Sequence, residues 1–429
     1  MKNAILYITL FFSLLLSSSS MAEPLGTEQS TAYVQDPQLQ KLFDLTLSQN
    51  PTIQYAVSQQ ASALSEQKMM LTLQKPEVHY QGSLGYAWTQ NSDFARTANK
   101  LEATYPLYEP DKQDLYSAAS YRHEASKLQV EEIKQALLLK VSKHYFKYWA
   151  QQAELTFLQK EFESISDIMG QVNQRFKVGY QDLNDISDIQ ARLDRNRADR
   201  LKAEQRLAIT RLNIEQLVGS SIDWERLKWQ EGLPPKLNES TEDSNVEEQI
   251  RQHPSLKRLE QDQFASDKQV AYAKNRDGVL VKAFGAYINN QSEGNFYDDM
   301  QGFRAGLQLN LPLYQSGRTD AAIAKARAET YQVQAQKRQQ RLMITTSLKL
   351  AYLSVKSGLK QLEALKEAMR SNEQAVKSAE KGLTTGNRNI LDLLDAQRNL
   401  HRAERDIQIE KNNIWQSWYL YQWSRGEIS

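Results

Sequence analysis

The stretch from Lys112 to Val178 contains no proline and a single glycine, Gly170. Its apolar residues recur at alternating steps of three and four, the heptad rhythm of a helix that packs against other helices. They are Leu155, Leu158, Phe162, Ile165, Met169, Val172 and Phe176. A single helix over this stretch would be roughly 100 Å long, far longer than a helix of an ordinary globular domain. Such a rod must bundle with similar helices or span an extended space.

The chain contains a second stretch of the same kind, from Lys325 to Leu383. The two stretches superpose with their surroundings at an offset of 206 or 207 residues, which pairs Pro106 with Pro312, Tyr145 with Tyr352, Gly179 with Gly386, Asp185 with Asp392, Asp188 with Asp395 and Gly219 with Gly426. So many matches at an almost constant offset indicate a tandem duplication. We therefore expect two structural repeats, residues 23–219 and 253–429, joined by an irregular connector over 220–252 with one short helix.

The first residues indicate export. Lys2 precedes an apolar run from Ala4 to Leu16, and Ser20-Met21-Ala22 offers small residues where a signal peptidase cleaves. We expect residues 1–22 to be a signal peptide. The rest of the chain has 52 basic and 52 acidic residues, which gives no reason to expect nucleic acid as a partner. The absence of cysteine excludes a disulfide framework and a lipid-modified cysteine.

Each repeat is expected to begin with helices, over about 39–47 and 51–74 in the first and over about 253–276 in the second. The apolar period then changes from helical to two. Alternation of this kind predicts strands over about 78–89, 99–108, 279–289 and 301–313.

Strands of about 10 residues with one apolar and one polar face are typical of outer-membrane barrels. The alternative is a half-exposed sheet on a soluble core. The export signal and the adjoining rods favour the barrel. Four strands cannot close a barrel, because about 8 is the smallest known and open edges are not tolerated in lipid. A barrel must therefore be shared among subunits.

Long helices are expected over about 111–178 and 318–383, each ended by a glycine that suits a left-handed helix terminus, Gly179 or Gly386. Three residues later, Asp182 and Asn389 are good N-caps. Return helices are therefore expected over about 182–218 and 389–424.

Each half of the chain has the same order of elements: helix, two strands, long helix, glycine turn and return helix. In this order the whole chain after the signal peptide resembles the TolC family of outer-membrane efflux and secretion channels. The closest local matches to the family's two turns are Arg175 to Gly179 and the segment Gly386-Asn387-Arg388-Asn389-Ile390-Leu391-Asp392-Leu393-Leu394-Asp395-Ala396-Gln397. The resemblance implies a mainly α fold with a small β part, in which a homotrimer forms one twelve-stranded barrel in outer-membrane lipid and a helical tunnel across the Gram-negative periplasm. It also implies passive exit for substrates delivered by an inner-membrane pump of RND, ABC or MFS type through a periplasmic adaptor (membrane fusion) protein.

By this resemblance, Asp392 and Asp395 correspond to acidic rings at the periplasmic entrance, where three subunits would place six carboxylates around one pore and attract cations. The alternative is that these residues only favour a helix N-terminus, as a carboxylate in a first turn does in any protein. We favour the gate for Asp392 and Asp395, and the helix-terminus role for Asp185 and Asp188.

The family's closed state also uses links between neighbouring turns. By resemblance, Arg388 would take part in these links, with Asn184 and Asp185 on the opposing turn. Where the family has a tyrosine, this chain has Leu383, which cannot hydrogen-bond to Asp185. The adaptor would contact the residues that flank the two turns, Val178, Gly179, Thr385 and Gly386.

The sequence gives no sign of an enzyme, a cofactor or a metal site. The five histidines (His79, His123, His144, His253 and His401) have no metal-ligand spacing, and we find no phosphate loop or nucleophile elbow. The charged face from Arg192 to Arg206 is interpreted as solvated surface. The remaining alternative is a periplasmic structural coiled coil or adaptor without a pore, although an adaptor would carry one hairpin, without membrane-type strands.

Overall fold

A computed structural model of the chain describes residues 36–88, 93–179, 182–228, 232–235, 237, 246–292 and 299–428. They belong to one compact unit, Val34–Ser429. The expected signal peptide lies outside the described residues.

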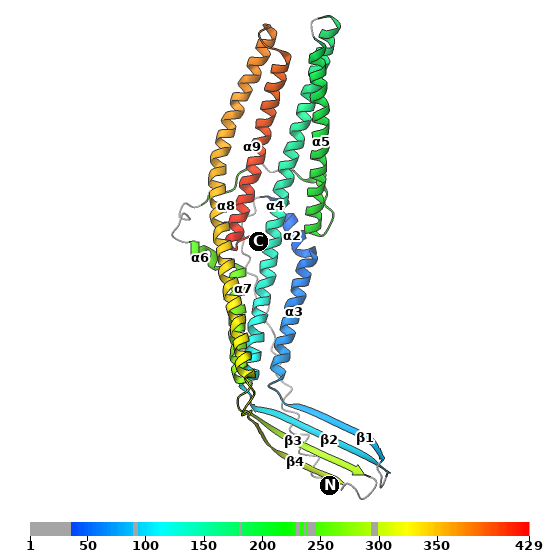
Figure 1. The fold of residues 1–429 in the computed structure, drawn as a ribbon. Coiled ribbons are helices and arrows are strands. Elements are labelled where there is room, and N and C mark those ends of the chain that lie inside the picture. Colours follow the sequence, from blue (N-terminus) through cyan, green and yellow to red (C-terminus); the bar gives the residue numbers. More distant parts are fainter. Residues whose placement is uncertain are drawn as a thin grey trace. The chain divides into compact units, whose positions relative to one another are not determined.

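The fold is mostly helical with four antiparallel strands, in agreement with the fold class expected from the sequence (Figure 1). The first half comprises α2 (Pro37–Gln49), α3 (Pro51–Thr72), β1 (Glu77–Trp88), β2 (Asp93–Tyr108), α4 (Pro110–Lys177) and α5 (Leu183–Val218). The second half comprises α7 (Pro254–Asn275), β3 (Leu280–Ser292), β4 (Met300–Asn310), α8 (Arg318–Thr384) and α9 (Ile390–Arg425). The described part of the connector holds two short helices rather than one, η1 (Trp224–Arg226) and α6 (Val246–Arg251).

Strand ends differ from the expected ones. β2 begins at Asp93 rather than near 99, and β3 continues to Ser292 rather than to about 289. Backbone hydrogen bonds between the strands continue through these polar residues. The predicted strands are shorter because they are based on the alternation of apolar and polar side chains, which stops earlier. β4 ends at Asn310 rather than near 313, and Pro312 beyond it has no N–H to offer a neighbouring strand.

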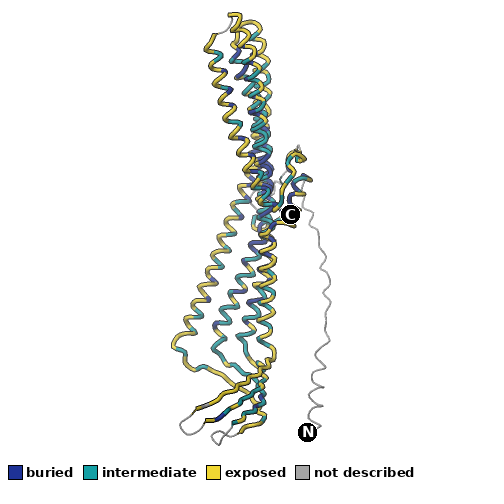
Figure 2. Tube along the Cα trace, turned by 90° about the vertical axis from the view of Figure 1, so that its right-hand side faces the viewer, coloured by how far each residue is buried: buried dark blue, intermediate teal, exposed yellow. Residues whose placement is uncertain are grey.

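The four strands form one sheet in the order β1-β2-β3-β4. Its register places Tyr80 opposite Leu101, Leu101 opposite Tyr287 and Tyr287 opposite Phe303, so these side chains share one face. The large side chains of that face are apolar or aromatic and open to the surroundings, since Tyr80 is 70% and Phe303 87% exposed. Much of the sheet is exposed along its strands (Figure 2). The opposite face carries polar residues such as Lys100 and Glu102, which form an ion pair of 2.6 Å.

The helices lie side by side in one layer. Near the sheet α4 lies between α3 and α7, and α7 contacts α8; farther from the sheet α4 lies between α5 and α9, and α9 contacts α8 (Figure 1). The edges of the layer are therefore α3 and α5 on one side and α8 on the other. None of the described helices combines the length and the apolar character needed to cross a lipid bilayer.

The largest core lies midway along the long helices, where α2, α5, α8 and α9 meet α4. Aromatic rings dominate it: Phe146 and Trp415 stack with ring centroids 5.9 Å apart. The Tyr145 hydroxyl donates a 2.5 Å hydrogen bond to Asp36, whose carboxylate also caps α2. This core fixes the long helices relative to one another, so their turns project from a rigid base.

Candidate functional site

The two helical turns lie at the ends of α4 and α8 that are remote from the sheet. Gly179 and Gly386 follow these helices with φ of +79° and +76°, which confirms the left-handed terminus predicted for each glycine. Val178 and Thr385 are the C-cap residues before them, and both are exposed. The four residues expected to contact an adaptor are thus at the tips of the two hairpins.

On the first turn, Asp182 is the N-cap of α5 and accepts a 3.4 Å hydrogen bond from the backbone N–H of Asn184. The side-chain amide of Asn184 donates to the same carboxylate at 3.2 Å. Asp185 follows in the first turn of α5 and is half-buried. Asn184 therefore orders its own turn within this subunit.

On the second turn, Asn389 is the N-cap of α9. Its side chain accepts a hydrogen bond from the N–H of Leu391 at 3.1 Å, and the Asp392 carboxylate accepts one from the N–H of Asn389 at 3.0 Å. This reciprocal arrangement is a capping box. Asp392 therefore has a structural partner in its own helix, while Arg388 is exposed and its aliphatic stem contacts Gly382 of the same hairpin.

Asp395 has a different partner, because its carboxylate forms an ion pair with Arg192 of α5. The side chains are 52% and 35% exposed, respectively. The solvated face expected for Arg192 is thus also an ion-pairing one, because Arg192 is partly exposed and paired at the same time. Arg192 and Asp395 lie far apart in the sequence and no spacing relates them, so only the way the two hairpins meet in the structure reveals the pair.

An apolar cluster lies beneath the turns and joins the two hairpins. It consists of Ile165, Ile168 and Val172 from α4, Ile189 and Leu193 from α5, and Ile390 and Leu394 from α9. Leu383 is partly buried against this cluster. Leu383, which cannot hydrogen-bond to Asp185, therefore makes apolar contact with this cluster instead.

Further from the turns, three more ion pairs join α4 to α9. Glu161, only 7% exposed, accepts a 2.6 Å contact from Arg398 and a 2.9 Å hydrogen bond from Asn196 of α5. Lys160 pairs with Glu404 at 2.7 Å, and Arg405 pairs with Glu154 at 3.1 Å. The charged side chains of α9 are thus paired with opposite charges of α4 along the contact between the two hairpins, which we call the seam.

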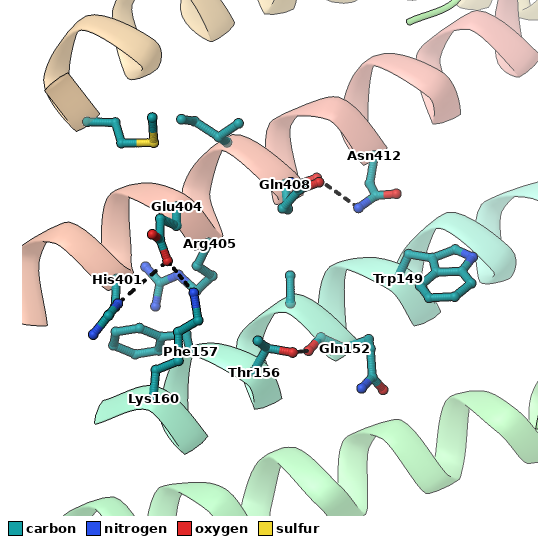
Figure 3. Close-up of a pocket in the computed structure, with 13 residues that line it drawn as sticks. Trp149, Gln152, Thr156, Phe157, Lys160, His401, Glu404, Arg405, Gln408 and Asn412 are labelled. Atoms are coloured by element: carbon teal, nitrogen blue, oxygen red, sulfur yellow. Dashed lines mark hydrogen bonds and ion pairs between the residues drawn. The ribbon is translucent and has the colours of Figure 1, made fainter. Parts of the chain in front are cut away.

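A cavity of about 430 Å³ opens along this seam between α4, α8 and α9 (Figure 3). Trp149 and Phe157 line one wall, and Lys160, Glu404 and Arg405 cross its end. Each of these charged groups is already paired, and the Arg405 guanidinium also lies 4.8 Å from the centre of the Phe157 ring. Among the described residues no group of three His, Asp or Glu could hold a metal ion.

The family model described as "Outer membrane efflux protein" matches residues 42–220 and 245–418, and so covers most of both halves. The chain belongs to this family. It is therefore an outer-membrane efflux or secretion channel of a Gram-negative cell and not an enzyme, and the alternative of a poreless coiled coil or adaptor is excluded.

Individual members of the outer membrane efflux protein family are distant in sequence. The outer membrane protein TolC of Vibrio cholerae is 25% identical over 410 residues, which cover 91% of this chain and 88% of that protein. The proteases secretion protein PrtF of Dickeya chrysanthemi is 21% identical over 347 residues, covering 80% and 75% of the two chains. The crystal structure of the outer membrane protein VceC of Vibrio cholerae superposes with a TM-score of 0.81 at 15% identity over 91% of this chain and 97% of that one.

Proposed function

We propose that the chain forms a homotrimeric channel-tunnel that gives passive exit to substrates delivered by an inner-membrane pump, of RND, ABC or MFS type, through a periplasmic adaptor. The observation that carries this proposal is that the subunit has two different open edges. Each edge combines a strand that lacks a partner on one side with edge helices that expose apolar side chains.

The sheet supplies the first part of each edge. In the described sheet β1 and β4 each pair on one side only, and an open strand edge is not tolerated in lipid. The outward apolar face, with Leu84 at 80% and Leu307 at 70% exposure, is suited to lipid. Joining β4 of one subunit to β1 of the next satisfies both edges, and three copies give a barrel of twelve strands.

The helices supply the second part. Each edge of the helical layer exposes apolar side chains. On one side these are Tyr55 and Met69 of α3 and Leu201, Ile209 and Leu212 of α5. On the other side they are Tyr331, Leu342, Leu350 and Leu353 of α8. Contact between two different patches is heterologous, and it closes into a ring when the rotation permits. The chain connects α3 to β1 and β4 to α8, so one rotation can satisfy sheet and helices together.

The turns would form the periplasmic end of the tunnel. We propose Asp392 and Asp395 as its acidic entrance, where three copies would attract cations. Arg388, Asn184 and Asp185 would link neighbouring turns. The exposed tips at Val178, Gly179, Thr385 and Gly386 would meet the adaptor, and the pump would supply the energy.

Disulfide trapping tests the trimer directly, since the chain has no cysteine of its own. Leu212 and Leu353 lie at about the same distance, about 30 residues, from the turn ends of α5 and α8. The double variant Leu212→Cys, Leu353→Cys is expected to give covalent dimers and trimers on oxidation. The control Leu212→Cys with Tyr331→Cys places the thiols at different heights and should stay monomeric on a denaturing gel. Equal cross-linking of both variants would overturn the proposed arrangement.

Conductance tests the pore. The purified protein in planar bilayers should show cation-selective channels that divalent cations block, and Asp392→Ala with Asp395→Ala should abolish block. If pores form and their block by divalent cations is unchanged in the double variant, the proposed channel stands, and Asp392 and Asp395 only stabilise the N-terminus of α9. The absence of pores from well-folded trimers would contradict the tunnel.

A further inference from the structure

The ion pair between Arg192 and Asp395 is held in place by the apolar cluster beneath the turns. On α5, Arg192 stands beside buried Leu193, and on α9, Asp395 stands beside buried Leu394. Both leucines belong to the same cluster, so the backbones that carry the two charges are fixed relative to each other. The pair is therefore preorganised although its side chains are partly solvated.

The two aspartates at this end of α9 differ in what they contact. The Asp392 carboxylate accepts a hydrogen bond from a neutral backbone N–H, that of Asn389. The Asp395 carboxylate is paired with a guanidinium of its own chain. An ion approaching these residues would therefore meet a net negative charge at Asp392 and a compensated charge at Asp395.

We propose that Arg192 is a charge-determining residue of the pore entrance: it cancels the Asp395 carboxylates, so that of the two aspartates of α9 only Asp392 attracts cations there. This inference rests on the proposed function, because it needs three subunits around one entrance. Three copies of Arg192 offset three of the six carboxylates and halve the net charge of the ring. The field in a narrow constriction follows that net charge, and at 0.1 M salt it extends over a Debye length of about 10 Å.

The two partners consequently have opposite effects when they are removed singly. Arg192→Gln uncovers Asp395 and makes the entrance more acidic. Asp395→Asn leaves Arg192 as an uncompensated cation beside Asp392. Removing both restores the original net charge. An ion pair that served only to hold the hairpins together would give changes of the same sign in both single variants.

The experiment measures reversal potential in a KCl gradient and half-blocking concentration of a divalent cation for trimers in planar bilayers. Arg192→Gln should raise cation preference and lower the half-blocking concentration several-fold. Asp395→Asn should do the reverse, and the double variant should return close to the native values. Arg192→Lys keeps the charge and should keep native selectivity. The matched control is Arg197→Gln, since Arg197 pairs with Asp194 of its own helix at 3.1 Å, and it should change neither quantity.

The possible outcomes distinguish a failure of the role of Arg192 from a failure of the proposed acidic entrance. If Arg192→Gln leaves selectivity and block unchanged while Asp392→Asn weakens block, the acidic entrance stands and the role of Arg192 is refuted. If Arg192→Gln raises total conductance without altering selectivity, the pair is a mechanical fastening and the inference is likewise refuted. If Asp392→Asn and its combination with Asp395→Asn both leave block intact, the acidic entrance itself fails.

Discussion

His253 caps α7 through its imidazole, whose Nδ1 accepts a 3.2 Å hydrogen bond from the backbone N–H of Ser255. Both residues are almost fully buried. In the first half of the chain Asn50 performs the same task for α3, accepting from the N–H of Thr52 at 2.8 Å. The two halves thus use a titratable and a non-titratable cap at equivalent positions.

Acidification should destabilise the protein through His253. Burial lowers the pKa of His253 to about 4 from an ordinary 6.5, so the folded state favours the neutral ring. Its contribution to stability is complete above pH 6.5 and is lost as the pH falls towards 4. The loss amounts to about 2 kcal/mol at pH 5. Urea unfolding at pH 7.5 and 5 should show this loss.

The matched variant is His253→Asn, which copies the cap of the first half and cannot titrate. It should remove this part of the pH dependence and leave the part that comes from other groups. A pH dependence identical to that of the native protein would show that folding does not shift the pKa of His253.

Two helical glycines should respond oppositely to alanine. A Cβ on Gly358 of α8 would lie 2.8 Å from Ile414 Cγ1 and 2.9 Å from Glu410 Oε1, both on α9. Ile414 is completely buried and cannot withdraw. Gly358→Ala should therefore destabilise the protein by about 1–3 kcal/mol. A Cβ on Gly170 of α4 meets nothing within 4 Å, so Gly170→Ala should stabilise by about 0.5–1 kcal/mol.

Unfolding midpoints of the two variants measure this contrast. The opposite signs matter more than the sizes, because the intrinsic helix preference for alanine is the same at both positions. A stabilising Gly358→Ala would mean that α8 and α9 do not approach closely at this level.

Much of the fold could be predicted because its determinants are local. The steps of three and four from Leu155 to Phe176 define the packed face of α4, and the glycines at 179 and 386 end the long helices as their conformational freedom requires. The partnership of Arg192 with Asp395 could not be predicted, because it depends on how two hairpins meet. The start of β2 at Asp93 could not be predicted for a related reason. Backbone pairing with β1 extends the strand through residues whose side chains show no alternation of apolar and polar character.

The buried carboxylate of Glu161 should be sensitive to the loss of its partner. Arg398→Gln leaves that charge with only the amide of Asn196, and we expect a loss of about 1–3 kcal/mol after allowing for the partial exposure of Arg398. Adding Glu161→Gln should recover part of it. Arg370→Gln, which breaks an exposed pair with Glu367, should cost about 0–1 kcal/mol. Equal losses for Arg398→Gln and Arg370→Gln would contradict a buried link.

Asp392 should reveal two separable contributions, one from its hydrogen bond and one from its charge. Asp392→Asn keeps an oxygen that can accept from the Asn389 N–H, so α9 should lose little stability. Asp392→Ala removes the acceptor and should cost about 0.5–2 kcal/mol. Both variants remove the carboxylate, so both should weaken divalent block equally if Asp392 lines the entrance. Unfolding and bilayer recordings on the same three proteins distinguish the cases. Native block in Asp392→Asn together with reduced stability in Asp392→Ala would assign the carboxylate to the N-terminus of α9 alone.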